Sequence, residues 1–126
     1  MRRADRMARF NRLLPNRVIR TFAGWLPPLA VVVHRGRRSG RAYRTPVMAF
    51  GLPDGYLVAL FYGADRDWVR NVLAADSCTL ERGGRRVALT APRLLGRDDA
   101  LALTRGPLRS VLRLLRVARF MRLSGR

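Results

Sequence analysis

The sequence predicts an α+β protein in which a mostly antiparallel sheet of five or six strands closes into a small barrel, with helices packed outside it. Three observations lead to this prediction. Short apolar runs separated by turn residues fill the middle of the chain, segments with helical spacing lie on either side, and the chain has only 126 residues. A sheet of this size in so short a chain favours closure into a barrel.

The N-terminal segment, residues 1–28, is predicted to be helical. Apolar residues recur at helical spacing from Met7 to Leu26, which is the pattern of an amphipathic helix. Pro15 is expected to kink or break this helix, and Pro27-Pro28 is expected to end it.

Five strands are predicted in the middle of the chain. They are residues 29–34, 46–51, 56–62, 78–81 and 86–91. The second and third are joined by LPDG at residues 52–55, and the fourth and fifth by RGG at residues 82–84. Both connections are rich in residues that favour tight turns. Residues 68–75 are predicted to form a short helix with Asp67 as its cap.

Beyond the strands, the chain is predicted to be basic and helical. A short helix over residues 97–103 is expected to start near Asp98. A longer amphipathic helix is expected over residues 107–123, with Pro107 in its first turn. Apolar residues share one side of this longer helix, and most of its arginines lie elsewhere.

The length of 126 residues and the 48% of hydrophobic residues suit a single domain, residues 1–126, with a packed core. The prediction divides it into an N-terminal helical segment (1–28), a barrel core (29–95) and a C-terminal basic helical segment (96–126).

Charge is the most unusual property of the chain. The formal net charge is +18 at pH 7, and every basic residue is an arginine. Such a surface attracts phosphates, acidic cofactors or an anionic membrane face. We therefore keep open a weak peripheral association of the basic terminal segments with an anionic membrane. Their alternative role is to cover the barrel and present arginines to water.

The composition also excludes several classes of site. One cysteine, Cys78, provides no disulfide framework and no cysteine cluster for a metal. One histidine, His34, argues against histidine-based zinc sites and a serine–histidine triad. No metal is expected, and a reducing cytoplasm fits best. The N-terminus lacks the pattern of a signal peptide, and the longest apolar stretch, residues 22–33, is too short to span a bilayer.

The segment HRGRRSGRAYRTP, residues 34–46, holds five arginines, two glycines and no acidic residue between two apolar runs. Its centre, residues 36–41, can expose backbone N–H groups while arginines supply charge, which is the pattern of an anion-binding turn. Glycines at positions 36 and 40 allow close backbone approach or a positive φ. A solvated charged loop is the alternative, because arginine is abundant throughout the chain.

Three segments in order, GRRSGRAYRTPVMAF, DGYLVALFYGA and DWVRNVLAADSCTL, resemble the deazaflavin (coenzyme F420)-dependent nitroreductase family. The resemblance covers residues 29–95 and rests on the order and spacing of the motifs. It places the chain in the flavin/deazaflavin oxidoreductase split β-barrel superfamily. The implied fold is a small split β-barrel of about six mostly antiparallel strands with peripheral helices at both termini.

The resemblance also implies a cofactor site for F420. The basic turn would hold the phosphate and acidic tail, the start of the following strand would run past the ring, and the loop and helix after the third strand would close the site. The implied residues are Arg37, Arg38, Ser39, Arg41, Arg44, Thr45, Pro46, Val47, Met48, Leu60, Phe61, Tyr62, Gly63, Trp68, Val69, Arg70 and Asn71. Some relatives carry a basic residue in place of Tyr43.

The implied reaction is hydride transfer from reduced F420, rather than FMN, to a quinone, a nitroaromatic or an activated alkene. The tail lacks the tyrosine-rich substrate segment of some members, so the acceptor does not carry over. Tyr62 is the candidate for orienting the substrate or donating a hydrogen bond to it. The alternative is that Tyr62 only packs on the barrel rim.

Four other residues have more ordinary interpretations. His34 is expected to be a surface or turn residue, and Cys78 a small buried apolar one. Trp68 either fills the core alone or also shapes the pocket. Asn71 either caps its helix locally or forms a hydrogen bond across to a loop.

Two other functions stay open at this point. The first is a non-catalytic split-barrel protein that binds F420, a flavin or a lipophilic ligand. The second is a nucleic-acid binder, which charge alone suggests and which the absence of a recognisable reader motif disfavours. The sequence leaves the oligomeric state open.

Overall fold

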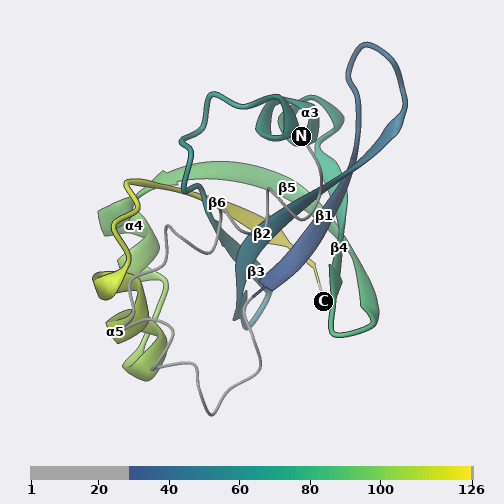
Figure 1. Ribbon diagram of the computed structural model, residues 1–126. Coiled ribbons are helices and arrows are strands. Elements are labelled where there is room, and N and C mark those ends of the chain that lie inside the picture. The colour runs from purple at the N-terminus through teal and green to yellow at the C-terminus, as the bar shows by residue number, and fades with distance from the viewer. Residues whose placement is uncertain (1–28, 126) are drawn as a thin grey trace.

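The computed structural model describes residues 29–125. The predicted N-terminal helical segment, residues 1–28, lies outside the described residues. The strands of the described structure are β1 Leu29–Arg35, β2 Ala42–Leu52, β3 Gly55–Ala59, β4 Ser77–Arg82, β5 Arg85–Gly96 and β6 Arg119–Ser124. Its helices are α3 Asp67–Ala75, α4 Arg97–Ala102 and α5 Gly106–Leu114 (Figure 1).

The six strands close into a barrel in the order β1-β2-β3-β6-β5-β4. Each neighbouring pair is antiparallel. The predicted α+β fold with a small antiparallel barrel is therefore confirmed. Pairing of β4 with β1 closes the barrel, so neither of these two strands is left as an exposed sheet edge.

The predicted helix over residues 107–123 is wrong in its second half. Helix α5 ends at Leu114, and β6 then fills the gap between β3 and β5. The helical periodicity of the apolar residues continues past Leu114, but pairing with two strand edges outweighs local helix propensity. The barrel core therefore includes β6 and does not end at residue 95.

Three of the strands also begin or end at residues other than those predicted. The second strand begins at Ala42 rather than Pro46, because Ala42–Thr45 pair with the end of β1. The third ends at Ala59 rather than Tyr62, and the following residues turn back through a hydrogen bond from Gly63 N to Leu60 O of 3.0 Å. The fifth runs on to Gly96 through a register shift after Thr90, where it reaches β6.

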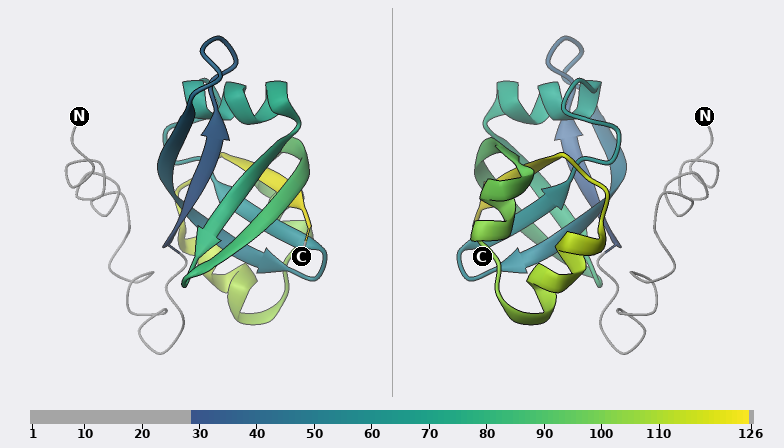
Figure 2. Two further views of the ribbon diagram at one scale, coloured as in Figure 1. Left: turned by 90° about the vertical axis from the view of Figure 1, so that its right-hand side faces the viewer. Right: turned by 90° about the vertical axis from the view of Figure 1, so that its left-hand side faces the viewer.

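Two hydrophobic clusters hold the fold together. The first fills the barrel and includes Val32, Val47, Val69, Leu80, Leu89, Met121 and Leu123. The second lies between the barrel wall and α4 and α5, and includes Met48, Phe50, Leu57, Val111, Leu112, Leu115 and Phe120. Figure 2 shows α3 across one end of the barrel and α4 and α5 against one side. Strand β2 contributes side chains to both clusters because its alternate residues point to opposite faces of the sheet.

Helix α3 closes the end of the barrel nearest the β1–β2 turn (Figure 1). Val69 and Val72 contribute its buried face to the barrel cluster. Cys78, just after this helix, is buried as predicted, and burial raises the pKa of its thiol to about 11. The thiol therefore stays protonated at neutral pH, which makes it a poor nucleophile.

Over residues 29–125, none of the helices is long and apolar enough to cross a bilayer. In the same part of the chain, no group of three or more His, Cys, Asp or Glu side chains could hold a metal ion.

Candidate functional site

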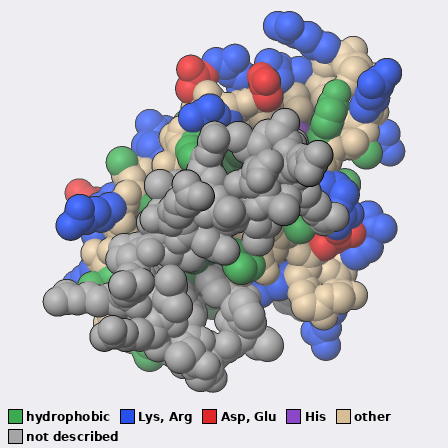
Figure 3. Space-filling model, in the orientation of Figure 1, with side chains coloured by type: hydrophobic (Ala, Val, Ile, Leu, Met, Phe, Trp, Pro, Cys, Tyr) green, Lys and Arg blue, Asp and Glu red, His purple; other side chains and the backbone are tan. Residues whose placement is uncertain are grey.

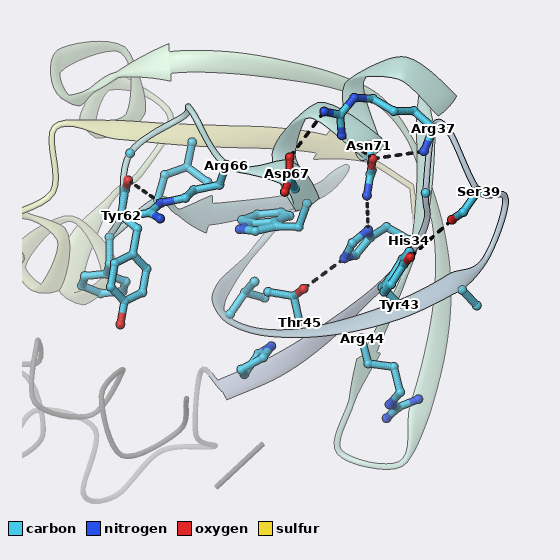
Figure 4. Close-up of a pocket in the computed structure, with 18 of the residues that line it drawn as sticks. His34, Arg37, Ser39, Tyr43, Arg44, Thr45, Tyr62, Arg66, Asp67 and Asn71 are labelled. Carbon is cyan, nitrogen blue, oxygen red and sulfur yellow. Dashed lines mark hydrogen bonds and ion pairs between the residues drawn. The ribbon is translucent and has the colours of Figure 1, made fainter. Parts of the chain in front are cut away.

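A pocket of about 1010 Å³ opens between the β1–β2 turn, the loop that follows β3 and the start of α3 (Figure 4). Most of the residues implied by the family resemblance line this one pocket. They are Arg37, Arg38, Ser39, Arg44, Thr45, Pro46, Val47, Leu60, Phe61, Tyr62, Gly63, Trp68 and Asn71. The topology brings the β1–β2 turn, the loop after β3 and the start of α3 together. Strand β2 lies between β1 and β3 in the barrel, and α3 follows β3 in the chain at the same end of the barrel.

Four implied residues do not line the pocket. Met48 belongs to the cluster under α4 and α5, because it lies on the opposite face of β2 from Val47. Val69 is fully buried in the barrel cluster. Arg70 is exposed and pairs with Asp65 in the preceding loop. Arg41 is exposed at the end of the turn.

The β1–β2 turn, residues 36–41, is closed by its own backbone. Gly36 N donates to Arg41 O at 2.8 Å, and Gly40 N donates to Gly36 O at 2.9 Å. Gly40 has a φ of 72°, which favours glycine. A Cβ at Gly36 would stand 2.6 Å from Ser39 Oγ. Glycine therefore suits the positive φ at position 40, and at position 36 it leaves room for the Ser39 and Tyr43 side chains beside the turn.

Arg37 fastens the turn to α3. Its backbone N and its Nη1 both donate to Asn71 Oδ1, at 3.1 and 2.8 Å, and its Nη2 lies 3.3 Å from Asp67 Oδ1. Asn71 thus forms the hydrogen bond across to a loop, which was one of its two predicted roles. The predicted cap is wrong: Arg66 is the N-cap residue of α3, and Asp67 is its first helical residue, paired with Arg37.

His34 is buried, 5% exposed, so its interpretation as a surface or turn residue is wrong. Its Nε2 lies 3.0 Å from Thr45 Oγ1, its Nδ1 lies 3.1 Å from Asn71 Nδ2, and its ring stacks on Tyr43 at 5.8 Å. Burial lowers the pKa of its imidazole. A signal was present in the sequence: His34 follows Ala30 and Val32 at alternate positions, and all three face inward.

Tyr62 lies at the other end of the pocket from Ser39 (Figure 4). Tyr62 is 41% exposed, and the Arg66 guanidinium stands 5.4 Å from the centre of its ring. Arg66 Nε also donates to the Tyr62 carbonyl at 3.2 Å. The tyrosine is therefore held at the rim with its ring open to solvent. Trp68 packs on the barrel cluster and also lines the pocket, which agrees with the second of its two predicted roles.

The charge of the pocket is positive and only partly paired. Arg37 pairs with Asp67, and Arg44 pairs with Glu81 on β4. Arg38 is exposed in the turn, and Figure 3 shows arginines gathered where the turn projects from the barrel. Gly36 of the predicted anion-binding turn also lines the pocket, whereas sequence reasoning missed the remaining lining residues, which are His34, Ala42, Tyr43, Ala59, Arg66 and Asp67.

Residues 3–111 match the model of the family described as F420H(2)-dependent quinone reductase. A solved F420-H2 dependent reductase (FDR-A) is similar to this chain with 19% identity and a TM-score of 0.53, covering 77% of this chain and 94% of its own. A structure described as a domain-swapped dimer has 19% identity, a TM-score of 0.50 and coverage of 77% and 80%. No curated protein matches the sequence. At these identities the structural likeness shows the fold.

Proposed function

The chain belongs to the F420H(2)-dependent quinone reductase family, and on this premise we propose that it transfers a hydride from reduced coenzyme F420 to an electron-poor acceptor. A quinone is the first choice of acceptor, with nitroaromatics and activated alkenes as further candidates. The observation that carries the proposal is the pocket, which joins an arginine turn to an apolar and aromatic wall in one cavity of about 1010 Å³.

The turn end of the pocket fits the phosphate and acidic tail of F420. Arg38 and Ser39 stand exposed there, and Arg37 is held in place by Asn71. Guanidinium groups can bind phosphate and carboxylate oxygens through paired hydrogen bonds. Because the turn is fastened before any ligand arrives, little conformational entropy is lost on binding.

The pocket also has an apolar wall that fits a flat, largely apolar ring. Pro46, Val47, Leu60, Phe61 and Trp68 line this wall, and Trp68 also packs against the barrel cluster. An apolar wall with a few polar groups is typical of a cofactor pocket. Such a wall keeps water away from the ring and so disfavours competing reactions.

When bound, F420 supplies the hydride, and the protein supplies binding, orientation and the exclusion of water. We propose that Tyr62 orients the acceptor from the rim, since its exposed ring is steadied by Arg66. His34 is unsuited to deliver the proton, because it is buried and both its ring nitrogens have partners in the wall. The proton is then proposed to come from water.

We propose that the reaction takes place in the cytoplasm. We also propose a weak association of the protein with an anionic membrane, which would suit a lipophilic acceptor. The membrane association can be tested by sedimentation with vesicles that contain or lack anionic lipid, since electrostatic attraction to the surface requires anionic headgroups.

The cofactor proposal is tested by titrating the protein with F420, and in parallel with FMN, while fluorescence is followed. Arg37→Ala/Arg38→Ala should weaken F420 binding at least about tenfold, since hydrogen bonds to charged groups contribute roughly 1.5–3 kcal/mol each. The matched control is Arg82→Ala/Arg85→Ala, which removes the same charge from the β4–β5 turn outside this pocket. Equal losses in both variants would indicate attraction by net charge alone.

Turnover is a separate measurement. Oxidation of reduced F420 is followed with a naphthoquinone and with a nitroaromatic, each with and without protein. Binding with no turnover of any acceptor would favour the non-catalytic binding protein. No binding of F420 or FMN would overturn the proposal.

A further inference from the structure

His34 has no assigned part in hydride transfer, yet this buried residue is the centre of a partly buried series of hydrogen bonds in the pocket wall. These hydrogen bonds link Arg37 to Asn71, Asn71 to His34, and His34 to Thr45 (Figure 4). Arg37 and Thr45 both line the pocket. The imidazole therefore connects Arg37, at the arginine-rich turn end of the pocket, with the Thr45 hydroxyl group in the pocket wall.

The direction of each hydrogen bond in this series follows from Arg37. Two N–H groups of Arg37, at 3.1 and 2.8 Å, point at one oxygen of Asn71, which fixes that atom as Oδ1. The amide nitrogen Nδ2 therefore faces His34 Nδ1, at 3.1 Å. Because an amide nitrogen only donates, Nδ1 must accept and carries no proton.

A neutral imidazole with no proton on Nδ1 carries its proton on Nε2. Nε2 lies 3.0 Å from Thr45 Oγ1, so it donates to the threonine oxygen. The hydroxyl proton of Thr45 then points away from His34. Since Thr45 lines the pocket, this hydroxyl is available as a donor to a ligand.

We propose that His34 is a positioning residue that makes the Thr45 hydroxyl a dedicated hydrogen-bond donor to the pocket and keeps Asn71 turned so that it holds Arg37. The ligand must then present an acceptor, such as a ring carbonyl oxygen, next to Thr45. That part rests on the proposed function, in which the ligand is F420. The tautomer of His34 does not depend on it.

The surroundings of His34 favour the same neutral form. Tyr43 of β2 stacks on the ring, and the charged groups on the α3 side are Arg37 and Asp67, both beyond Asn71. A proton on Nδ1 would face the N–H of Asn71, so two donors would oppose each other. Turning the Asn71 amide over would relieve this clash, but its NH₂ group would then face the two donors of Arg37.

The first experiment measures the tautomer directly in the ligand-free protein. His34 is the only histidine in the chain, so one ¹⁵N-labelled imidazole gives an unambiguous two-bond ¹H–¹⁵N spectrum. We expect a protonated Nε2 and an unprotonated Nδ1 at pH 7.5. A proton on Nδ1, or a charged ring at this pH, would overturn the proposal whether or not F420 binds.

The second experiment separates the two hydrogen bonds of His34. His34→Asn offers an acceptor near the Nδ1 position. It should keep Asn71 and Arg37 in place but lose the hydrogen bond to Thr45. His34→Gln offers an amide near the Nε2 position and should do the reverse. In F420 titrations, Thr45→Val should weaken binding about tenfold in the wild type, and much less in His34→Asn, where the hydroxyl is no longer oriented.

Thr45→Ser, which keeps the hydroxyl, should bind nearly as the wild type does, and the melting temperature of each variant reports whether it folds. Thr45→Val and His34→Asn effects that simply add would overturn the coupling between the two residues. If F420 does not bind the wild type, the proposed function fails, while the ¹⁵N spectrum still decides the orientation of the series of hydrogen bonds.

Discussion

Arg37 and Asn71 are separated by 34 residues in sequence and joined by two hydrogen bonds to the same oxygen. One comes from the backbone of the β1–β2 turn and the other from the arginine side chain. The turn and α3 are thereby fixed relative to each other on either side of the pocket. The oxygen and the nitrogen of the buried amide both have partners, since its nitrogen lies 3.1 Å from His34 Nδ1.

Asn71→Ala should both destabilise the protein and weaken cofactor binding. It removes the acceptor of two Arg37 donors and leaves the buried Nδ1 of His34 without a partner, which typically costs about 1–3 kcal/mol. Urea denaturation measures the stability. The control is Arg70→Ala on the same helix, whose exposed ion pair with Asp65 should contribute no more than about 1 kcal/mol. Equal stability of wild type and Asn71→Ala would contradict this account.

Stability should fall as pH is lowered below about 6.5, in part because of His34. Burial lowers its folded pKa below the ordinary 6.5, so in this range the unfolded chain binds more protons than the folded one. The free energy of unfolding therefore rises with pH through this window and falls towards acid. The measurement is urea denaturation from pH 7.5 to 5, with His34→Asn as the control, because it lacks the titrating group. A parallel pH dependence in both proteins would assign the effect to other groups.

Gly36→Ala should impair the pocket more than the fold. The added Cβ would stand 2.6 Å from Ser39 Oγ and 2.9 Å from the Tyr43 ring, so these side chains or the turn that carries them have to shift. We expect F420 affinity to fall about tenfold or more while the melting temperature changes little, since the turn is exposed. Gly51→Ala in β2 is the matched control, because its Cβ would meet no atom within 4 Å. Unchanged affinity in Gly36→Ala would show that the turn tolerates the shift.

Much of this arrangement could be predicted from the sequence, because it is local. Alternating apolar residues and turn residues indicate the strands, and the motif order indicates which segments meet at the pocket. Strand β6 could not be predicted this way, since its apolar residues also fit a helix and only the edges of β3 and β5 select the strand. His34 was missed because its partners Thr45 and Asn71 are 11 and 37 residues away.

Arg97 connects α4 with the segment that leads into β6, and Arg97→Ala should destabilise the barrel without changing the cofactor site. Its guanidinium donates to the carbonyl oxygens of Leu115 at 2.5 Å, Arg113 at 2.7 Å and Val117 at 3.5 Å. The first two are the shorter hydrogen bonds, and they satisfy carbonyl groups at the end of α5, which has no later helical turn to pair with them.

We expect Arg97→Ala to lower the free energy of unfolding by about 1–3 kcal/mol, because it leaves these carbonyl groups without a donor. Arg97→Lys should recover only part of this loss, since one ammonium group cannot reproduce the planar fork of the guanidinium. Arg93→Ala, an exposed position on β5, controls for the change in charge and should shift stability by no more than about 0.5 kcal/mol. F420 affinity measured well below the melting temperature should be the same in all three variants, because none of these residues lines the pocket. A loss of affinity in Arg97→Ala alone would show instead that the closure of the barrel by β6 is coupled to the pocket.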